Sequence, residues 1–363
     1  MNRGKGLILA MTVAFTAACA SGGGGGMEEP AATGNRPTDN SFTNSAGVQL
    51  AQAGLTEGQE ATAHYQAALT DAMEAVREDS TNPKAYLMAG QAAIGLEQWI
   101  RADSMFDRAE SLYPPYEEQI ASEREQGWVN AYNLGAEAMN AEDMDEALRM
   151  FEGADRLYQE RPEARMALGS LYLREGNTEQ AIEAYRGALA ILSGPPPEGM
   201  EEEQIAGWEQ DRQVAAFNAA QLLAESGSYN EAAEVLQGFM DDNEGQLDPA
   251  TVLRGKVALA GFLAQGDRDE EAEALYEEIL GREDLTSAEY FQIGIGFFNT
   301  GDYARAAEAF KEAAELNPYS RDALLNLVQS LYSQALDVEE MEETAQRNQR
   351  LNDIYDEIVA AAE

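Results

Sequence analysis

One cysteine, Cys19, and one histidine, His64, are the only side chains of their kinds that could act as a nucleophile, a base or a soft metal ligand. Covalent catalysis needs a nucleophile paired with a base, and the chain shows no Cys–His or Ser–His–Asp arrangement of suitable spacing. Zinc sites need several cysteine or histidine ligands. Since His64 stands beside Tyr65 at the start of an expected helix, we predict a solvated or capping histidine. The sequence therefore predicts no enzyme and no cofactor.

Carboxylates are abundant, so calcium binding has to be tested against the known loop pattern. Residues 241–248 (DDNEGQLD) begin like an EF-hand loop, but Gly245 stands one position early and the closing pattern is missing. Residues 142–146 (EDMDE) fall at an expected turn between helices, where acidic N-caps and first-turn charges are favoured. With 66 acids, carboxylate pairs of the glycosidase kind arise by chance. No metal site is predicted.

The charge balance is strongly acidic, with 66 Asp and Glu against 24 Lys and Arg, a net charge of −42 and an isoelectric point near 4.1. Such a field repels nucleic acid and anionic lipid surfaces, so phosphate binding is excluded as a function class. Two interpretations remain open. The acidic faces keep the protein soluble, for example in a salty environment, or they steer a basic protein or peptide partner.

The N-terminus has the pattern of a secretory signal. Arg3 and Lys5 precede an apolar run at residues 7–18 (LILAMTVAFTAA), which is too short to span a bilayer as a helix. The small residues before Cys19 resemble the lipobox of bacterial lipoproteins, although Thr16 stands where leucine is usual. The resemblance implies that the signal peptide 1–18 is removed and that Cys19 is lipidated, with palmitate among the expected acyl groups.

The lipoprotein resemblance also implies a location in the bacterial cell envelope. Under the sorting rule of enterobacterial lipoproteins, Ala20 after the cysteine directs the anchor to the outer membrane, facing the periplasm. In a bacterium with one membrane, the same anchor faces outward. Residues 19–47 are rich in Gly, Ser, Asn and Pro, which predicts a flexible linker. The glycines at 22–26 lack the following Lys-Ser/Thr of a phosphate loop.

The rest of the chain contains an internal repeat. Residues 168–191 align with residues 293–316. The aligned pairs are Gly169 with Gly294, Tyr172 with Phe297, Gly176 with Gly301, Ala181 with Ala306, Tyr185 with Phe310, and Ala188 with Ala313. This spacing resembles the tetratricopeptide repeat, a helix–turn–helix unit of about 34 residues in which Gly169 is position 8 and Tyr185 position 24. The resemblance implies close helix approach at position 8 and interlocking along the second helix.

Further copies keep this frame at 90–114, 134–154, 220–236 and 260–276, with a degenerate unit at 65–75 and a polar end helix at 341–362. We therefore predict an all-α fold, an α-solenoid of about six or seven helix–turn–helix repeats. An N-terminal array at 48–192 is followed by a Pro- and Glu-rich connection at 193–212, which runs into the next helix. A C-terminal array with a capping helix occupies 213–363. The connection is a hinge or a long loop on a continuous solenoid.

In the tetratricopeptide family, positions 2, 5, 9 and 12 of the first helix line the concave face. Position 5 is apolar throughout: Leu87, Tyr132, Met166, Phe217, Val257 and Phe291. We predict that these six residues bind a partner, with packing against neighbouring helices as the alternative. Position 9 holds Gln91, Ala136, Ser170, Gln221, Gly261 and Ile295. Because Leu87 and Gln91 replace Lys and Asn, the family's carboxylate clamp is absent.

The leading hypothesis is a membrane-anchored scaffold or adaptor that binds protein or peptide partners in a concave groove. The alternative is a lipoprotein of an uptake system that captures a glycan or another small molecule. The three tryptophans separate the two hypotheses. Clustered on one exposed face, Trp99, Trp128 and Trp208 would favour glycan capture, whereas scattered or buried they would favour the scaffold.

Overall fold

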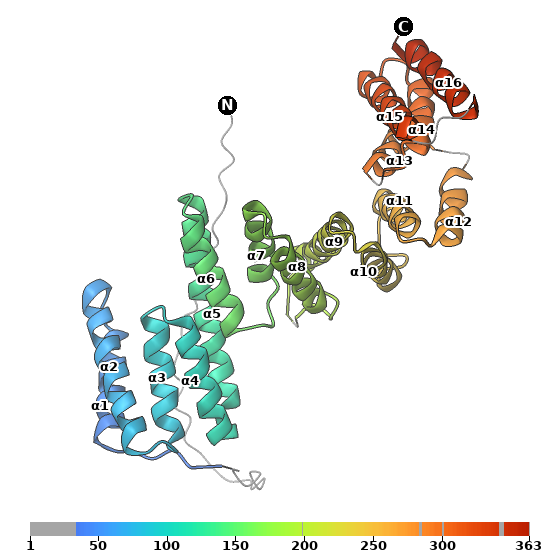
Figure 1. The fold of residues 1–363 in the computed structure, drawn as a ribbon. Coiled ribbons are helices and arrows are strands. Elements are labelled where there is room, and N and C mark those ends of the chain that lie inside the picture. Colours follow the sequence, from blue (N-terminus) through green and yellow to red (C-terminus); the bar gives the residue numbers. More distant parts are fainter. Residues whose placement is uncertain (1–33, 198, 283–284, 300, 341–344, 363) are drawn as a thin grey trace.

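Consecutive helices pair into antiparallel hairpins that follow one another in an elongated array, with α1/α2 at one end and α15/α16 at the other (Figure 1). This computed structural model describes residues 34–363 except 198, 283–284, 300, 341–344 and 363. The elements are α1 (Ser41–Ala53), α2 (Gly58–Glu78), α3 (Pro83–Gly95), α4 (Trp99–Leu112), a short 3-10 turn η1 (Pro114–Tyr116), α5 (Glu117–Asn140), α6 (Met144–Leu157), α7 (Glu163–Glu175), α8 (Thr178–Leu192), α9 (Glu202–Glu225), α10 (Tyr229–Asp242), α11 (Pro249–Gln265), α12 (Asp269–Leu280), α13 (Ser287–Asn299), α14 (Tyr303–Leu316), α15 (Arg321–Glu340) and α16 (Ala345–Ala362).

The predicted all-α solenoid is confirmed: within the described ranges the chain forms helices and no strand. The described residues form eight hairpins, because α1/α2 and α15/α16 each complete a unit whose pattern is degenerate in the sequence. Such an array buries its apolar surface only between neighbours, so each hairpin depends on the next for its core.

Position 8 explains how the two helices of a hairpin approach each other. A glycine of the first helix faces the aromatic ring of the second in four hairpins: Gly90 with Phe106, Gly135 with Phe151, Gly169 with Tyr185, and Gly294 with Phe310. A Cβ atom at Gly135 would lie 2.8 Å from the Phe151 ring, and one at Gly294 would lie 2.7 Å from the Phe310 ring. Both rings are buried, so the missing side chain creates the space that the core fills.

Position 15 supplies the turn inside each hairpin. Its residues have positive φ angles from 56° to 83° in six hairpins: Glu97, Glu142, Gly176, Gly227, Asp267 and Gly301. Glycine adopts this left-handed conformation without strain, whereas Glu97, Glu142 and Asp267 adopt it at a steric cost. The neighbouring Gly266 has φ −90°.

The N-terminal boundary of the array differs from the prediction. The expected linker 19–47 gives way to α1 at Ser41, where Asn40 and Thr43 form a capping box. The preceding residues also pack: Asn35 N donates to Leu112 O at 2.8 Å, and Asn82 Nδ2 donates to Thr38 O at 2.9 Å. The linker was predicted too long because α1 buries small and polar residues that lack a strong apolar period. The expected signal peptide 1–18 and Cys19 lie outside the described residues.

The Pro- and Glu-rich connection runs into the next helix within the predicted range 193–212. Helix α9 already begins at Glu202, so only residues 193–201 join it to α8. The Trp208 indole Nε1 donates to Leu192 O at 3.2 Å, and the buried ring packs with Ala188 and Ala215. Because α8 and α9 pack directly on each other, this packing favours a long loop on a continuous array over a hinge.

Candidate interaction surface

The six position-5 residues are not equally accessible. Leu87 is 5% exposed within a cluster that includes Trp99 and Phe106, and Val257 is 2% exposed, with its Cγ1 filling the space where a Cβ at Gly296 would lie. The expectation of an exposed residue is therefore wrong at Leu87 and Val257, because neighbouring helices already fill their surroundings. The other four are half-buried: Tyr132, Met166, Phe217 and Phe291.

The half-buried aromatic residues rest on rings of the second helix. The ring centroids lie 5.4 Å apart for Tyr132 and Phe151, and 5.5 Å apart for Phe291 and Phe310. Phe217 also carries the Arg254 guanidinium at 4.4 Å from its ring centroid. One side of each ring therefore belongs to the intramolecular core, which matches the packing alternative in part.

Three exposed apolar side chains of the first helices lie two turns further along, at position 12, while Val48, Ile205, Val214 and Leu336 are exposed at other positions. Met139, Leu173 and Tyr332 occupy this position with exposures of 41%, 45% and 56%, and Leu325 at position 5 of α15 is 53% exposed. We call these four residues the exposed row. Residues seven apart share a helix face, so the row continues the stripe that position 5 begins. The repeat frame included position 12, and reading it alongside position 5 would have found these residues.

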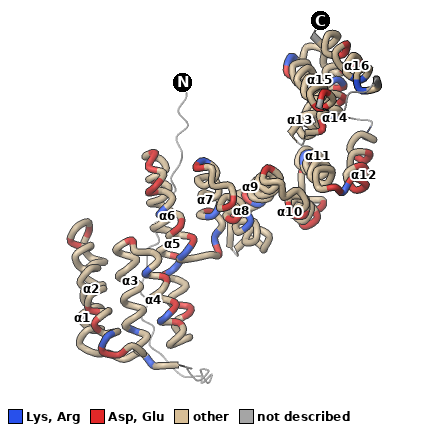
Figure 2. Tube along the Cα trace, in the orientation of Figure 1, with Lys and Arg blue, Asp and Glu red and all other residues tan. Residues whose placement is uncertain are grey.

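Acidic groups surround the first helices near Tyr132. Burial raises the pKa of the Glu163 carboxyl on α7 and of the Asp211 carboxyl on α9. Burial, and then the charges of Glu163 and Asp211, raise the pKa of Tyr132. Three consecutive first helices thus bring an aromatic ring and two poorly solvated carboxyls together. Figure 2 shows acidic residues along the whole described array, with Lys and Arg interspersed.

The nearest cation to Glu163 is already engaged. Arg161 Nη2 donates to Glu125 at 2.6 Å, and its guanidinium lies 4.9 Å from the Trp128 ring centroid. Its other terminal nitrogen is 3.9 Å from Glu163 Oε1, while Glu163 Oε2 is buried without a hydrogen-bond partner among the described residues. A carboxylate left in this state is stabilised by any cation that reaches it.

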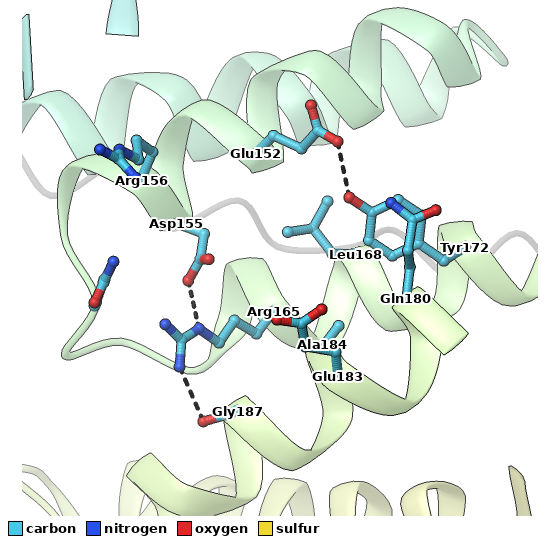
Figure 3. A pocket seen from close by; sticks show the side chains of 11 residues that line it. Glu152, Asp155, Arg156, Arg165, Leu168, Tyr172, Gln180, Glu183, Ala184 and Gly187 are labelled. Atoms are coloured by element: carbon cyan, nitrogen blue, oxygen red, sulfur yellow. Dashed lines mark hydrogen bonds and ion pairs between the residues drawn. The ribbon is translucent and has the colours of Figure 1, made fainter. Parts of the chain in front are cut away.

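A polar cleft of about 380 Å³ lies between α6, α7 and α8 (Figure 3). Its charged groups bind one another. Arg165 Nε donates to Asp155 at 2.5 Å and its Nη1 donates to Gly187 O at 3.2 Å, while the Tyr172 hydroxyl donates to Glu152 at 2.8 Å. These contacts join three helices, so the cleft is best explained as a polar packing junction.

The tryptophans and the histidine have structural surroundings. Trp99, Trp128 and Trp208 are all buried, so none offers an exposed face for stacking on a sugar. His64 Nδ1 lies 2.7 Å from Gln49 Oε1 and is half-buried, so it joins α2 to α1 and is neither fully solvated nor a helix cap.

The two acidic stretches considered for calcium have local roles. Asp143 accepts a hydrogen bond from Glu146 N at 3.2 Å and caps α6, and Asp248 accepts from Ala250 N and Thr251 N and caps α11. In the described part of the chain, no group of three or more His, Cys, Asp or Glu side chains is arranged to hold a metal ion. None of the described helices combines the length and apolar character needed to cross a bilayer.

The fold and its surface define an all-α solenoid of helical hairpins with an apolar row on the first helices. Two of its stretches, residues 132–196 and 287–320, match family models of the tetratricopeptide repeat, so the chain carries repeats of this kind. No curated protein sequence matches the chain.

Several solved structures are similar to the chain. A tetratricopeptide repeat protein from Parabacteroides merdae is 14% identical over 79% of this chain and 99% of its own, with a TM-score of 0.30. A thermophilic tetratricopeptide repeat protein of Thermus thermophilus is 20% identical over 56% of this chain and 99% of its own, with a TM-score of 0.31. YrrB, described as having an unusual peptide-binding site, is 16% identical over 70% of this chain and 96% of its own, with a TM-score of 0.29.

Proposed function

We propose that the protein is a scaffold that holds a protein or peptide partner against the first helices of its hairpins. The observation that carries this proposal is the exposed row, whose four large apolar side chains lie at positions of one repeat face on α5, α7 and α15. Apolar side chains left exposed along one face are typical of interaction sites, and an amphipathic helix or an extended peptide can cover such a stripe. The half-buried position-5 residues would form the floor beneath it.

The partner in this proposal is basic. Glu163 and Asp211 are poorly solvated carboxyls beside Tyr132, and Arg161 is already paired with Glu125. A lysine or arginine side chain of the partner would add a second positive charge beside Glu163, whose ion pair with Arg161 is long at 3.9 Å, and the net charge of −42 would accelerate its approach.

The proposal places the scaffold on a bacterial envelope membrane, with the outer membrane facing the periplasm as the expected site. This part rests on the signal-like N-terminus and the lipobox-like residues before Cys19. A Cys19→Ser variant should appear in the soluble fraction of cells while the parent stays with membranes. Equal membrane retention of the two proteins would remove the lipid anchor from the proposal.

The alternative of glycan capture has no supporting observation on the described surface. Sugar-binding proteins stack exposed aromatic faces on the ligand, and the three tryptophans here are buried. The scaffold is therefore the function that the geometry supports best.

The proposal is tested by crosslinking in intact cells, followed by membrane pull-down and mass spectrometry to name the partner. A double variant, Leu173→Asp with Tyr332→Asp, should then lose at least tenfold in affinity for that partner, since each buried anchor contributes more than about 1 kcal/mol. Leu55→Asp is the matched control, because Leu55 is also highly exposed but lies in the turn after α1. Unchanged affinity in the double variant, with helicity preserved, would refute the groove.

The charge of the partner is tested separately. Glu163→Gln should weaken binding about tenfold and reduce the salt dependence of association, because one screened charge pair is lost. Glu57→Gln, an exposed acid at the start of α2, should leave both quantities unchanged. An association rate that does not change with salt in the parent protein would exclude steering of a basic partner.

A further inference from the structure

The hairpin α15/α16, at one end of the described array, leaves apolar side chains exposed on its outer side (Figure 1). Position 5 is buried or half-buried in the six earlier hairpins that share the repeat frame. At Val257 of α11 the cover comes from the following first helix, because Val257 fills the space beside Gly296 of α13. Leu325 of α15 stands at the same position and is 53% exposed. This hairpin therefore exposes a surface that the inner hairpins cover.

Two rows of exposed side chains form this outer side. They recur at 325, 329, 332 and 336 on α15 and at 348, 352, 355 and 359 on α16, and each spacing places its row on one side of the helix. The rows lie next to each other. The Tyr355 hydroxyl donates to Glu339 of α15 at 2.5 Å, and this hydrogen bond, with Tyr332 among the further causes, raises the pKa of Tyr355. We call the two rows the end face: Leu325, Gln329, Tyr332, Leu336, Asn348, Asn352, Tyr355 and Val359.

The end face is neutral, although 25% of the chain is charged and the net charge is −42. Five of its members are large apolar or aromatic side chains with exposures between 41% and 58%: Leu325, Tyr332, Leu336, Tyr355 and Val359. The other three are amides. Acidic residues stand only at its edges, at Glu339 and Asp356. The end face is thus an uncharged and partly apolar area of an acidic surface.

A second copy of the chain matches this face better than a basic partner does. A basic protein pairs with carboxylates, and the two rows contain none. Two chains of net charge −42 repel each other over most of their surface, so contact between copies is favoured where charge is lacking. Asn, Gln and Tyr side chains both donate and accept hydrogen bonds, so they can pair with the same residue types on another copy. A two-fold contact uses one patch on both chains.

We propose that the end face is the contact of a homodimer, in which two copies meet through α15/α16 about a two-fold axis. Each copy then gives the other the packed layer that an inner hairpin receives from its neighbour. The contact includes Leu325 and Tyr332, so a second copy would compete with the proposed partner for this end of the exposed row and would leave Met139 and Leu173 free. The dimer forms without the partner, so its failure and that of the proposed function are distinguishable.

The experiment measures the mass of the purified full chain by sedimentation equilibrium. The chain carries Cys19→Ser, so that neither a lipid nor a disulfide at this residue can join two copies. The mass should rise from one copy to two with chain concentration, and added salt should favour the dimer because it screens the repulsion between acidic chains. Tyr355→Asp with Val359→Asp should weaken self-association at least about tenfold. Leu173→Asp is the matched control, since this exposed leucine of α7 lies outside the end face.

A charge exchange tests the two-fold contact itself and does not alter the apolar side chains. Asn348→Asp with Asn352→Asp makes the face negative, and Asn348→Lys with Asn352→Lys makes it positive. Each double variant alone should dimerise more weakly than the parent, whereas a mixture of the two should form heterodimers that salt weakens. Circular dichroism checks that every variant keeps its helicity.

Three outcomes would overturn the proposal. The first is a parent chain that stays monomeric up to about 0.1 mM, beyond the range of weak specific association. The second is growth of the parent into species larger than two copies, which would indicate a head-to-tail contact. The third is a mixture of the two charge variants that associates no better than either variant alone.

Discussion

Three glycines at position 26 of their repeats have three different surroundings. The Trp99 ring occupies the space beside Gly153 on α6. A Cβ atom at Gly187 on α8 would lie 2.9 Å from Arg165 Nη1, and a Cβ atom at Gly238 on α10 would contact nothing. The repeat frame therefore fixes where a small residue stands along the second helix. The side chain that reaches it comes from another helix and differs at each junction.

The helix contacts around Gly153 and around Gly187 also differ in how deeply their ion pairs are buried. Between α4, α5 and α6, Asp103 is 5% exposed and binds Arg124 as well as Arg156, the latter through Nε at 2.6 Å. Between α6, α7 and α8, the pair of Arg165 and Asp155 remains partly open to water (Figure 3). A buried charge must be matched, whereas a solvated pair contributes little to stability.

The largest effect should come from Asp103→Ala. Removing this carboxylate leaves the buried Arg124 guanidinium with the more exposed carboxylates of Asp107 and Glu110 and with Leu157 O, and we expect a loss of about 3 kcal/mol in the free energy of unfolding by urea. Asp107→Ala removes an exposed partner of the same arginine and should cost less than about 1 kcal/mol. Equal losses in the two variants would show that burial does not distinguish this junction.

Gly153→Ala should have the next largest effect. The new methyl group overlaps Trp99, and overpacking of this kind costs about 2 kcal/mol, measured as a lower midpoint of thermal or urea unfolding. Trp99→Leu removes the indole ring. In a Trp99→Leu background, Gly153→Ala should therefore lower the free energy of unfolding by less than it does in the parent protein. Strict additivity of the two substitutions would contradict the contact.

Gly238→Ala should act in the opposite direction. The position lies inside α10 with nothing near the new methyl group, so the gain in helix propensity should raise the free energy of unfolding by about 0.5–1 kcal/mol. A decrease in the free energy of unfolding would mean that side chains pack closely against Gly238, contrary to the open space described around it.

Gly187→Ala should give the smallest change. The contacted atom is the end of the flexible Arg165 side chain, so its displacement costs a weak pair while the alanine improves the helix. We expect the cost of the weakened ion pair and the gain in helix propensity to offset each other within about 0.5 kcal/mol. If Gly187→Ala lowered the free energy of unfolding as much as Gly153→Ala does, the Arg165 side chain would be no easier to displace than the Trp99 ring.

The repeat frame predicted those features that depend on local sequence. Positions 8 and 24 lie in one hairpin, so Gly135 and Phe151 could be paired from spacing alone. The first part of α1 was assigned to the linker because its buried residues, Thr43 and Ala46, are small and give no strong apolar period. The left-handed Glu142 was also missed, since only the turn as a whole, and not its own side chain, requires that conformation.

The candidate surface was predicted in part. Position 5 gave the correct helix face, but the burial of Leu87 and Val257 depends on rings and side chains from neighbouring helices. These contacts join residues far apart in the chain, and no periodicity encodes them. The exposure of Leu173 and Tyr332 likewise depends on which side chains of other helices reach them, and the sequence pattern does not encode this.

The contact between Trp208 and Leu192 has a consequence for chain continuity. Because α8 and α9 are held together by packing and not by residues 193–201, a backbone cut in that loop would leave the two fragments associated. The same property would let the two halves be produced as separate chains and reassemble by complementation.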